Sequence, residues 1–203
     1  MAGLRRIASR ELRSGTVLTF SEGSVLEFVG DAFVNAANEG CTGGFGIDEH
    51  TNKSGGFKLK EARKELGGCQ TGHAKTTAAF DHHNTRLIIH AVGPVYRINK
   101  LKDGVEPGSP EATALLAGKN ELLTAAYVSS LREAESHEVE TLAFCLLSAG
   151  VFRGEQTLDV IVGLAADAIA SAAYPSLSNC HLVAYTTEEA AALQALATQL
   201  GMS

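Results

Sequence analysis

The chain has 203 residues, of which 45% are hydrophobic and 20% are charged, proportions typical of one globular domain with a sizeable core. Its formal net charge of −6 argues against general nucleic-acid binding through neutralisation of phosphates. No run approaches the roughly 20 apolar residues that cross a bilayer, so no membrane partner is expected.

The cysteines and the N-terminal arginines bear on the cellular compartment. The cysteines are widely spaced, which is typical of reduced thiols and not of a disulfide framework: Cys41, Cys69, Cys145 and Cys180. We therefore expect an intracellular, cytoplasmic protein. Residues 1–15 carry four arginines, which fit a solvated N-terminal face or, less well, a short organelle transit peptide.

Apolar strand-like runs alternate with helical patterns along the chain, which indicates a single layered α/β domain. The expected strands are residues 17–20, 25–29, 32–36, 75–80, 86–92, 141–147 and 181–185. The polar segment 97–108 interrupts the pattern and is predicted to be an exposed surface loop. The α/β alternation continues on both sides of it, so it is not expected to link two domains.

Three helices are predicted after residue 108 from their caps and apolar spacing. Ser109, Pro110 and Glu111 give an N-cap, a proline at the first helical position and an acid in the first turn. Apolar residues recur at helical spacing between residues 158 and 172, which predicts the second helix. Thr186 and Glu189 form the capping box that begins the third.

The segment 31–48 carries the strongest functional signal. A strand of small apolar residues leads to Asn38, whose amide can hydrogen-bond a sugar or a base without carrying charge. Gly43, Gly44 and Gly46 follow. Glycines let the main chain approach a ligand closely and point its N–H groups inward, as an anion site requires. Asp48 lies ten residues after Asn38.

This segment resembles the macrodomain family, in which Val-Asn-Ala-Ala-Asn leads through a glycine run to a catalytic aspartate at the same spacing. The resemblance implies that Asn38 holds the ribose nearest the leaving group and that Asp48 orients or deprotonates a water. It also places Ile47 and the glycines against the ligand. Asp48 as a cap of the following helix is the alternative, and the two roles are compatible. Asn35 either contacts the ligand or, as the preferred account, holds adjacent loops together.

Two features of this segment depart from the family pattern. Phe45 replaces a glycine, and its ring can stack on the ribose, gate the site or block the entry of water. After Asp48, the sequence Glu-His-Thr-Asn replaces the usual Gly-Ala-Ile-His and makes the start of the helix more polar. Both features weaken the prediction of hydrolysis more than that of binding.

A second loop follows the strand predicted at 141–147. A strand, a turn of small residues and a helix N-terminus together form an anion site. The turn resembles the diphosphate loop of macrodomains, which implies that its backbone amides wrap a pyrophosphate and that the phenylalanine lies against a ribose: Ser148, Ala149, Gly150, Val151 and Phe152. Arg153 replaces a family glycine and either contacts phosphate or is solvated.

Two further stretches, residues 67–77 and 88–96, match family segments that we interpret as scaffold. His90, within the second stretch, is predicted to be a core histidine. The resemblance covers about residues 16–200, which leaves residues 1–15 as an N-terminal extension of a single macrodomain.

The aspartate that reads adenine in many family members is missing. Ser24 stands at its position, followed by Val25, and both are candidate ligand contacts. Serine offers a hydroxyl acceptor but no charge. Glu22 could compensate from nearby, and otherwise base recognition is weaker or different. Tyr185 and Thr186 are candidates for packing on the base, with core packing or capping as equal alternatives.

No metal or other cofactor is expected. The spacings of four possible ligands do not form a paired zinc pattern: Cys41, His50, Cys69 and His73. Nothing local marks Cys69 as a nucleophile, because no neighbouring base or source of a lowered pKa is identifiable.

The sequence thus predicts a three-layer α/β/α macrodomain-like fold with a central mixed sheet flanked by helices. The expected function is binding of ADP-ribose and hydrolysis of ADP-ribosyl adducts, either mono-ADP-ribosylated protein or O-acetyl-ADP-ribose. The alternatives are a non-catalytic ADP-ribose reader and a pocket adapted to another nucleotide or phosphorylated metabolite. We expect a monomer.

Overall fold

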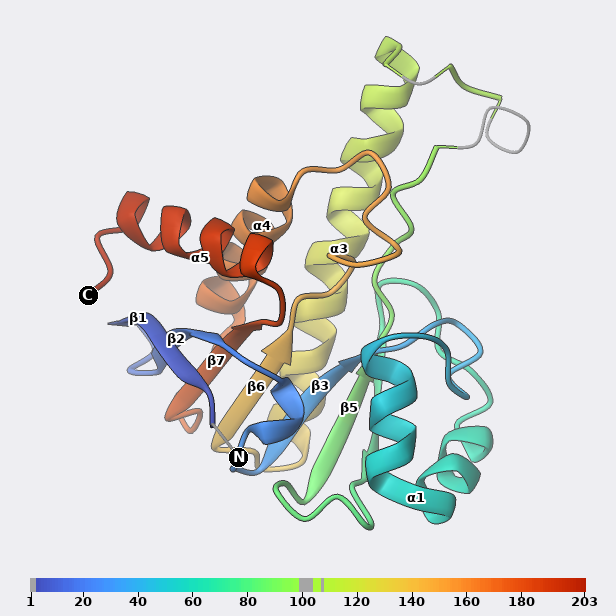
Figure 1. Ribbon diagram of the computed structural model, residues 1–203, viewed down its shortest axis with the longest axis vertical. Helices are drawn as coiled ribbons and strands as arrows, with labels where there is room; N and C mark the ends of the chain where they lie inside the picture. The colour runs from blue at the N-terminus through green and yellow to red at the C-terminus, as the bar shows by residue number, and fades with distance from the viewer. Residues whose placement is uncertain (1–2, 99–103, 107) are drawn as a thin grey trace.

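The computed structural model describes residues 3–98, 104–106 and 108–203 and is organised around one seven-stranded sheet (Figure 1). The strands are β1 (Arg5–Glu11), β2 (Val17–Glu22), β3 (Ala32–Ala36), β4 (Ala74–Ala78), β5 (Leu87–Ala91), β6 (Thr141–Cys145) and β7 (Asn179–Ala184). Their order across the sheet is β1-β2-β7-β6-β3-β5-β4. Part of the loop predicted at 97–108 lies outside the described residues.

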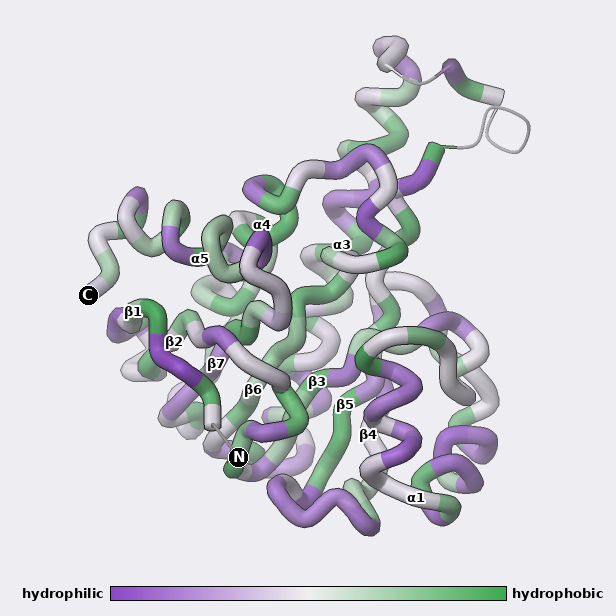
Figure 2. The backbone as a smooth tube through the Cα atoms, in the orientation of Figure 1, coloured by the Kyte–Doolittle hydropathy of each residue, from purple (hydrophilic) through white to green (hydrophobic). Residues whose placement is uncertain are grey.

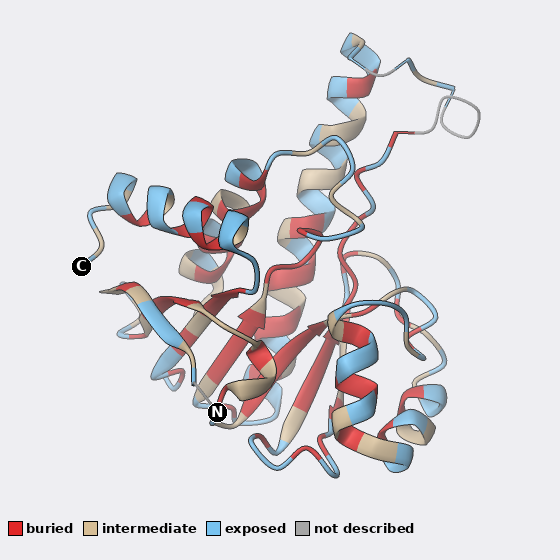
Figure 3. Cartoon of the chain, viewed as in Figure 1, coloured by how far each residue is buried: buried red, intermediate tan, exposed pale blue. Residues whose placement is uncertain are grey.

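The inner strands are parallel and the two edges are antiparallel, so the sheet is mixed as predicted. β2, β7, β6, β3 and β5 run in one direction, and β1 and β4 pair antiparallel with β2 and β5. Most residues of β5 and β6 are hydrophobic (Figure 2). The same central strands are largely buried, as expected for parallel strands covered on both faces (Figure 3).

The helices complete three layers. They are α1 (Ile47–Glu65), α3 (Pro110–Ser136), α4 (Leu158–Ala172) and α5 (Thr187–Gln199). One core cluster packs α3, α4 and α5 against the face of the sheet that carries Val34 and Phe144. A second packs Leu59 of α1 against the other face, through Phe33 and Ile88. Figure 1 accordingly shows α1 and α3 on opposite sides of β3 and β5.

The predicted caps of the later helices are confirmed. The Ser109 hydroxyl accepts a hydrogen bond from the N–H of Ala112 at 3.1 Å, and Thr186 and Glu189 form the reciprocal capping box of α5. The helix predicted between residues 158 and 172 is α4. Among the described residues, no helix combines the length and apolarity needed to cross a membrane.

Two predictions near the N-terminus are wrong. The strand expected at 25–29 is a single 3-10 turn, η1 (Val25–Glu27), because Val25 and Phe28 insert into the second core cluster and do not extend the sheet. Conversely, the arginine-rich segment expected to be only a solvated face contains β1. As an edge strand, β1 buries Ala8 while Arg5 and Arg6 stay exposed, an arrangement that tolerates charge.

Candidate functional site

The predicted site residues gather at one edge of the sheet because they follow the carboxyl ends of its parallel strands. The loop after β3 carries residues 37–46, and the loop after β6 carries residues 146–157. β3 and β6 are hydrogen-bonded neighbours, so these two loops leave the sheet side by side. Ligands of open α/β sheets characteristically bind at this edge.

Asn38 folds the first loop back on itself. Its Nδ2 donates to the carbonyl of Gly43 at 2.9 Å, and its Oδ1 accepts from the N–H of Cys41 at 3.1 Å. The glycines are required by packing. A Cβ on Gly43, where φ is 131°, would lie 2.4 Å from Nδ2 of Asn52. A Cβ on Gly44 would lie 3.1 Å from Nδ2 of Asn38.

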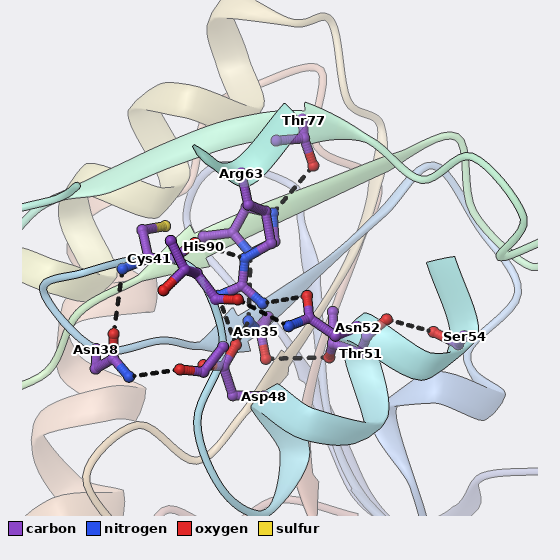
Figure 4. A network of polar contacts seen from close by, with 12 residues as sticks. Asn35, Asn38, Cys41, Asp48, Thr51, Asn52, Ser54, Arg63, Thr77 and His90 are labelled. Atoms are coloured by element: carbon purple, nitrogen blue, oxygen red, sulfur yellow. Dashed lines mark hydrogen bonds and ion pairs between the residues drawn. The ribbon is translucent and has the colours of Figure 1, made fainter. Parts of the chain in front are cut away.

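Asp48 lies beneath this loop and is only 3% exposed (Figure 4). It does not cap α1, whose N-cap is Gly46 and has no side-chain cap. Oδ1 of Asp48 accepts from Nδ2 of Asn35 at 2.7 Å and pairs with Nη2 of Arg63 at 2.6 Å. Its Oδ2 is buried without a partner, 3.3 Å from the position of a Cβ on Gly44. One carboxylate oxygen therefore faces the glycine-rich segment.

Arg63 is the functional residue that the sequence analysis missed. It is completely buried on α1, where its Nε donates to the carbonyl of Cys41 at 2.8 Å and its Nη1 to Oδ1 of Asn52 at 2.7 Å. Asn52 in turn donates to the carbonyl of Thr42 at 3.0 Å. One sequence signal was present: Arg63 follows Leu59 by four residues, so it lies on the buried face of the helix.

Asn35 supports Asp48 from below. It is fully buried, donates to Asp48 and to Nδ1 of His90 at 3.2 Å, and accepts from the hydroxyl of Thr51 at 3.1 Å. With both amide hydrogens used inside the protein, Asn35 holds β3 to α1, which corrects its inclusion among the ligand contacts. The preferred account of this residue is thus confirmed.

His90 is a core histidine, as predicted. Because the amide nitrogen of Asn35 can only donate, Nδ1 of His90 accepts, and its Nε2–H donates to the hydroxyl of Thr77 at 3.0 Å. Burial, and then the positive charge of Arg63, lowers the pKa of His90 well below its ordinary value. The imidazole is therefore neutral and structural.

Among the described residues, the turn at residues 148–152 of the second loop has one side-chain hydrogen bond. The Ser148 hydroxyl donates to the carbonyl of Pro94 at 2.8 Å, and Ser148 itself has a left-handed backbone with φ of 59°. The N–H of Tyr96 donates to the carbonyl of Phe152 at 2.7 Å. Gly150 and Val151 are exposed at the tip of the loop.

Both loops present unpaired backbone donors. In the described part of the chain, no protein atom accepts a hydrogen bond from the N–H groups of residues 148–152. The same holds for the N–H groups of residues 42–46. Most of these residues are exposed, so their N–H groups can be solvated in the free protein, and two neighbouring sets of free donors are suited to an anion.

The expected helix contribution at the second loop needs correction. α4 begins only at Leu158, with the Thr157 hydroxyl as its N-cap, so its positive end does not lie directly behind residues 148–152. Arg153 is neither free nor purely solvated, because its guanidinium pairs with the carboxylate of Glu188 at 2.8 Å. The anion donors here are the loop amides alone.

The residues proposed for adenine have other contacts. The Ser24 hydroxyl accepts from the N–H of Leu26 at 3.4 Å and caps η1, and the side chain of Val25 is buried in the core. Glu22 forms an ion pair with Arg5. Of this group, Tyr185 is the one largely exposed to solvent, 73% of its surface being accessible.

Phe45 is 85% exposed at the tip of the first loop. It lines a surface hollow of about 690 Å³ between that loop and the outer face of α1, where Phe57 is also exposed. A second hollow of about 540 Å³ includes Cys69 and His73. Burial raises the pKa of Cys69 to about 11, so its thiol is protonated at neutral pH. No group of three or more metal-binding side chains occurs in the described residues.

Comparison with known families agrees with this geometry. The family model described as Macro domain matches residues 34–160, which include both loops. The chain belongs to the Macro domain family. A macro domain-containing protein of Cupriavidus necator is 34% identical to this macrodomain over 181 residues, covering 86% of this chain and 94% of the relative. The family resemblance inferred from the sequence is thereby confirmed.

Other relatives carry more specific names. An O-acetyl-ADP-ribose deacetylase of Escherichia fergusonii is 32% identical over 186 residues, covering 89% of this macrodomain and 94% of the relative. Among solved structures, the Oceanobacillus iheyensis macrodomain with ADP superposes with a TM-score of 0.78 at 20% identity and 98% coverage of both chains. The Trypanosoma brucei macrodomain in complex with ADP-ribose gives 0.74 at 24% identity, covering 95% of this chain and 74% of that one. These likenesses confirm the predicted three-layer fold.

Proposed function

We propose that this macrodomain binds ADP-ribose and hydrolyses ADP-ribosyl adducts, either mono-ADP-ribosylated protein or O-acetyl-ADP-ribose. The observation that carries the proposal is the pair of adjacent loops with unpaired backbone N–H groups, residues 42–46 and 148–152. A diphosphate offers acceptor oxygens to both loops at once. Relatives named O-acetyl-ADP-ribose deacetylase and neighbours solved with ADP or ADP-ribose support this ligand class.

The ribose next to the scissile bond would lie over Asn38 and Asp48. One amide hydrogen of Asn38 is donated to Gly43, which leaves the second for a ribose hydroxyl. Oδ2 of Asp48 has no protein partner and would accept a hydrogen bond from the attacking water, thereby orienting it. As the oxygen of the water bonds to the reacting carbon, the bond from that carbon to the leaving oxygen would break, and the proton lost by the water would pass through Oδ2 of Asp48 to the leaving group.

A non-catalytic ADP-ribose reader is the second candidate, and one observation favours it. Asp48 is almost completely buried, and so is its unpartnered Oδ2. A reader would retain the loop amides and bind ADP-ribose without turnover.

Titration calorimetry and a turnover assay separate these functions. Calorimetry with ADP-ribose, its inosine analogue and AMP measures binding and the preference for the base. Absence of ADP-ribose binding by the wild-type protein overturns both candidates. Release of ADP-ribose from mono-ADP-ribosylated protein or from O-acetyl-ADP-ribose supports hydrolysis, and binding without release supports the reader.

Substitution of Asp48 requires care because it leaves the buried Arg63 without its partner. Asp48→Asn keeps the shape of the side chain and is preferable to Asp48→Ala. We expect turnover to fall by about 100-fold or more, as when a positioned acid–base group is removed. A thermal melt must first establish that the variant is folded at the assay temperature. Undiminished turnover in the folded variant would remove Asp48 from the reaction.

A further inference from the structure

Arg63 lies at the centre of the polar network beneath the glycine-rich loop (Figure 4). We propose that Arg63 is a positioning residue of the site, which holds Oδ1 of Asp48, leaves Oδ2 as its one unpaired oxygen, and sets the start of the loop in place beside it. The inference rests on the proposed function for the identity of the ligand. Its structural part can be tested without one.

The first step in the argument is the environment of the guanidinium. A fully buried charge is costly unless it is paired and hydrogen-bonded, and an apolar side chain of similar size is often as stable in such a place. Leu59, one turn earlier on the same face of α1, is apolar. Arg63 instead hydrogen-bonds two acceptors through Nε and Nη1, and its Nη2 forms an ion pair with Asp48 without a hydrogen bond. The contacts of Arg63 therefore contribute more to the geometry of the site than to the free energy of unfolding.

The second step concerns the carboxylate. Arg63 and Asn35 both bind Oδ1 of Asp48, at 2.6 and 2.7 Å, and together they fix the plane of the carboxyl group. Oδ2 is left buried, unpartnered and directed at the backbone of Gly44. A carboxylate held in this way can accept a hydrogen bond from one ligand hydroxyl or one water through Oδ2.

The third step links the same side chain to the loop. Nε of Arg63 binds the carbonyl of Cys41, and Nη1 binds Asn52, which in turn binds the carbonyl of Thr42. Asn52 also limits the space available beside Gly43. The carboxylate and the start of the loop are therefore set by one rigid group. Lysine could supply the charge but lacks the planar fork that reaches three acceptors.

The experiment compares Arg63→Lys and Arg63→Met with Lys64→Met. Lys64 is the next residue on α1, exposed and paired with Glu61, so it controls for loss of a positive charge from this helix. Backbone ¹⁵N relaxation is measured without ligand. We expect the order parameters of residues 41–46 to fall from about 0.85 to below about 0.6 in both Arg63 variants and to stay unchanged in Lys64→Met.

The ligand arm separates the two contributions of Arg63. The ADP-ribose Kd should rise about tenfold in both Arg63 variants, because the loop is released in both. The kcat should fall about tenfold in Arg63→Lys, which keeps a charge beside Asp48, and about 100-fold in Arg63→Met. A purely structural role would lower the melting temperature without this split between Kd and kcat.

The outcomes are distinguishable. Folded Arg63→Lys with a rigid loop and wild-type Kd and kcat overturns the inference. If both Arg63 variants fail to fold, Asn52→Ala decides, because it removes the link from Nη1 of Arg63 to Thr42 and leaves the contacts of Arg63 with Asp48 and Cys41: a loop as rigid as in wild type overturns the inference, and a loosened loop supports it. If the wild-type protein does not bind ADP-ribose, the proposed function is overturned. The relaxation data would still test whether Arg63 fixes the loop.

Discussion

Both loops of the site present unpaired backbone N–H groups, but different kinds of contact hold the two loops in place. The loop after β3 is held by side chains, with Asn38 closing it internally and Arg63 binding it from below. In the loop after β6, the turn at residues 148–152 has one side-chain hydrogen bond within the described part of the chain, from the hydroxyl of Ser148, while side chains hold the residues on either side of it. Both loops leave a run of backbone N–H groups free, at residues 42–46 and 148–152.

This difference follows from what each loop carries. Binding a diphosphate needs only donors in a suitable curve, and small residues with little side-chain support can supply them. Asp48 is buried, so its charge requires a counter-charge and hydrogen bonds that fix one of its oxygens. Buried polar side chains have to supply both. The conformation of the first loop should therefore change when residues outside it, such as Arg63, are substituted. The conformation of the second loop should change mainly when its own backbone is altered.

The largest expected effect is at the close contact in the first loop. Gly43→Ala places a Cβ 2.4 Å from Nδ2 of Asn52 at a backbone φ of 131°. We expect the free energy of unfolding to fall by about 2 kcal/mol or more, together with weaker ADP-ribose binding. Urea unfolding and calorimetry measure the two effects.

Gly163→Ala is the matched control for that substitution. Gly163 lies inside α4, and a Cβ there meets nothing within 4 Å. Alanine should stabilise this helix by about 0.5–1 kcal/mol. If Gly43→Ala were as stable as the wild type, the loop would not be held tightly against Asn52.

An intermediate effect should appear on acidification, through His90 on β5, which contacts Asn35 beneath the first loop. Burial holds the pKa of His90 below its ordinary value of 6.5, so below about pH 6.5 the unfolded chain takes up a proton that the folded protein does not. Stability is therefore full above this pH and is lost as the pH falls toward the folded-state pKa. The loss from one such group is at most about 1.4 kcal/mol per pH unit.

Denaturant unfolding between pH 7 and pH 5 measures this dependence. His90→Gln should reduce the slope by up to one proton. The residual slope includes His82 and His181, whose pKa values are also lowered by burial. Identical slopes for the variant and the wild type would contradict the assignment to His90. Residues 148–152 contain no histidine or carboxylate, so this turn of the second loop should not contribute.

The smallest effect is expected in the second loop. Ser148→Ala removes the hydrogen bond to the carbonyl of Pro94 and should cost about 1 kcal/mol of stability. The backbone N–H groups remain, so the ADP-ribose Kd should change little. A tenfold rise in Kd without loss of stability would mean that the hydroxyl itself contacts the ligand.

Much of the fold and the outline of the site could be predicted from the sequence. The N-cap at Ser109 and the capping box of Thr186 and Glu189 each depend on residues three positions apart, so the local sequence is enough to predict them. The glycine run before Asp48 and the small-residue turn at 148–152 are equally local. The family resemblance implies that both loops serve one ligand, whereas the pairing of β3 with β6, which brings them side by side, is seen only in the sheet.

Other features depend on contacts between distant segments. Val25 and Phe28 turn into the core because apolar surface is available there, and β1 pairs with β2 despite its arginines because an edge strand leaves their side chains in solvent. Asn35 is buried by α1, which it also helps to hold. None of these outcomes follows from spacing along the chain.

By itself, the sequence determined the α/β alternation, the helix caps and the two loops, because these follow from interactions among near neighbours in the chain. The tertiary structure decided which of Asp48's oxygens is free, and it did so through Arg63, fifteen residues later on the kinked α1. The physical reason is the cost of burying charge. A carboxylate and a guanidinium can share the interior only where folding brings each to the other.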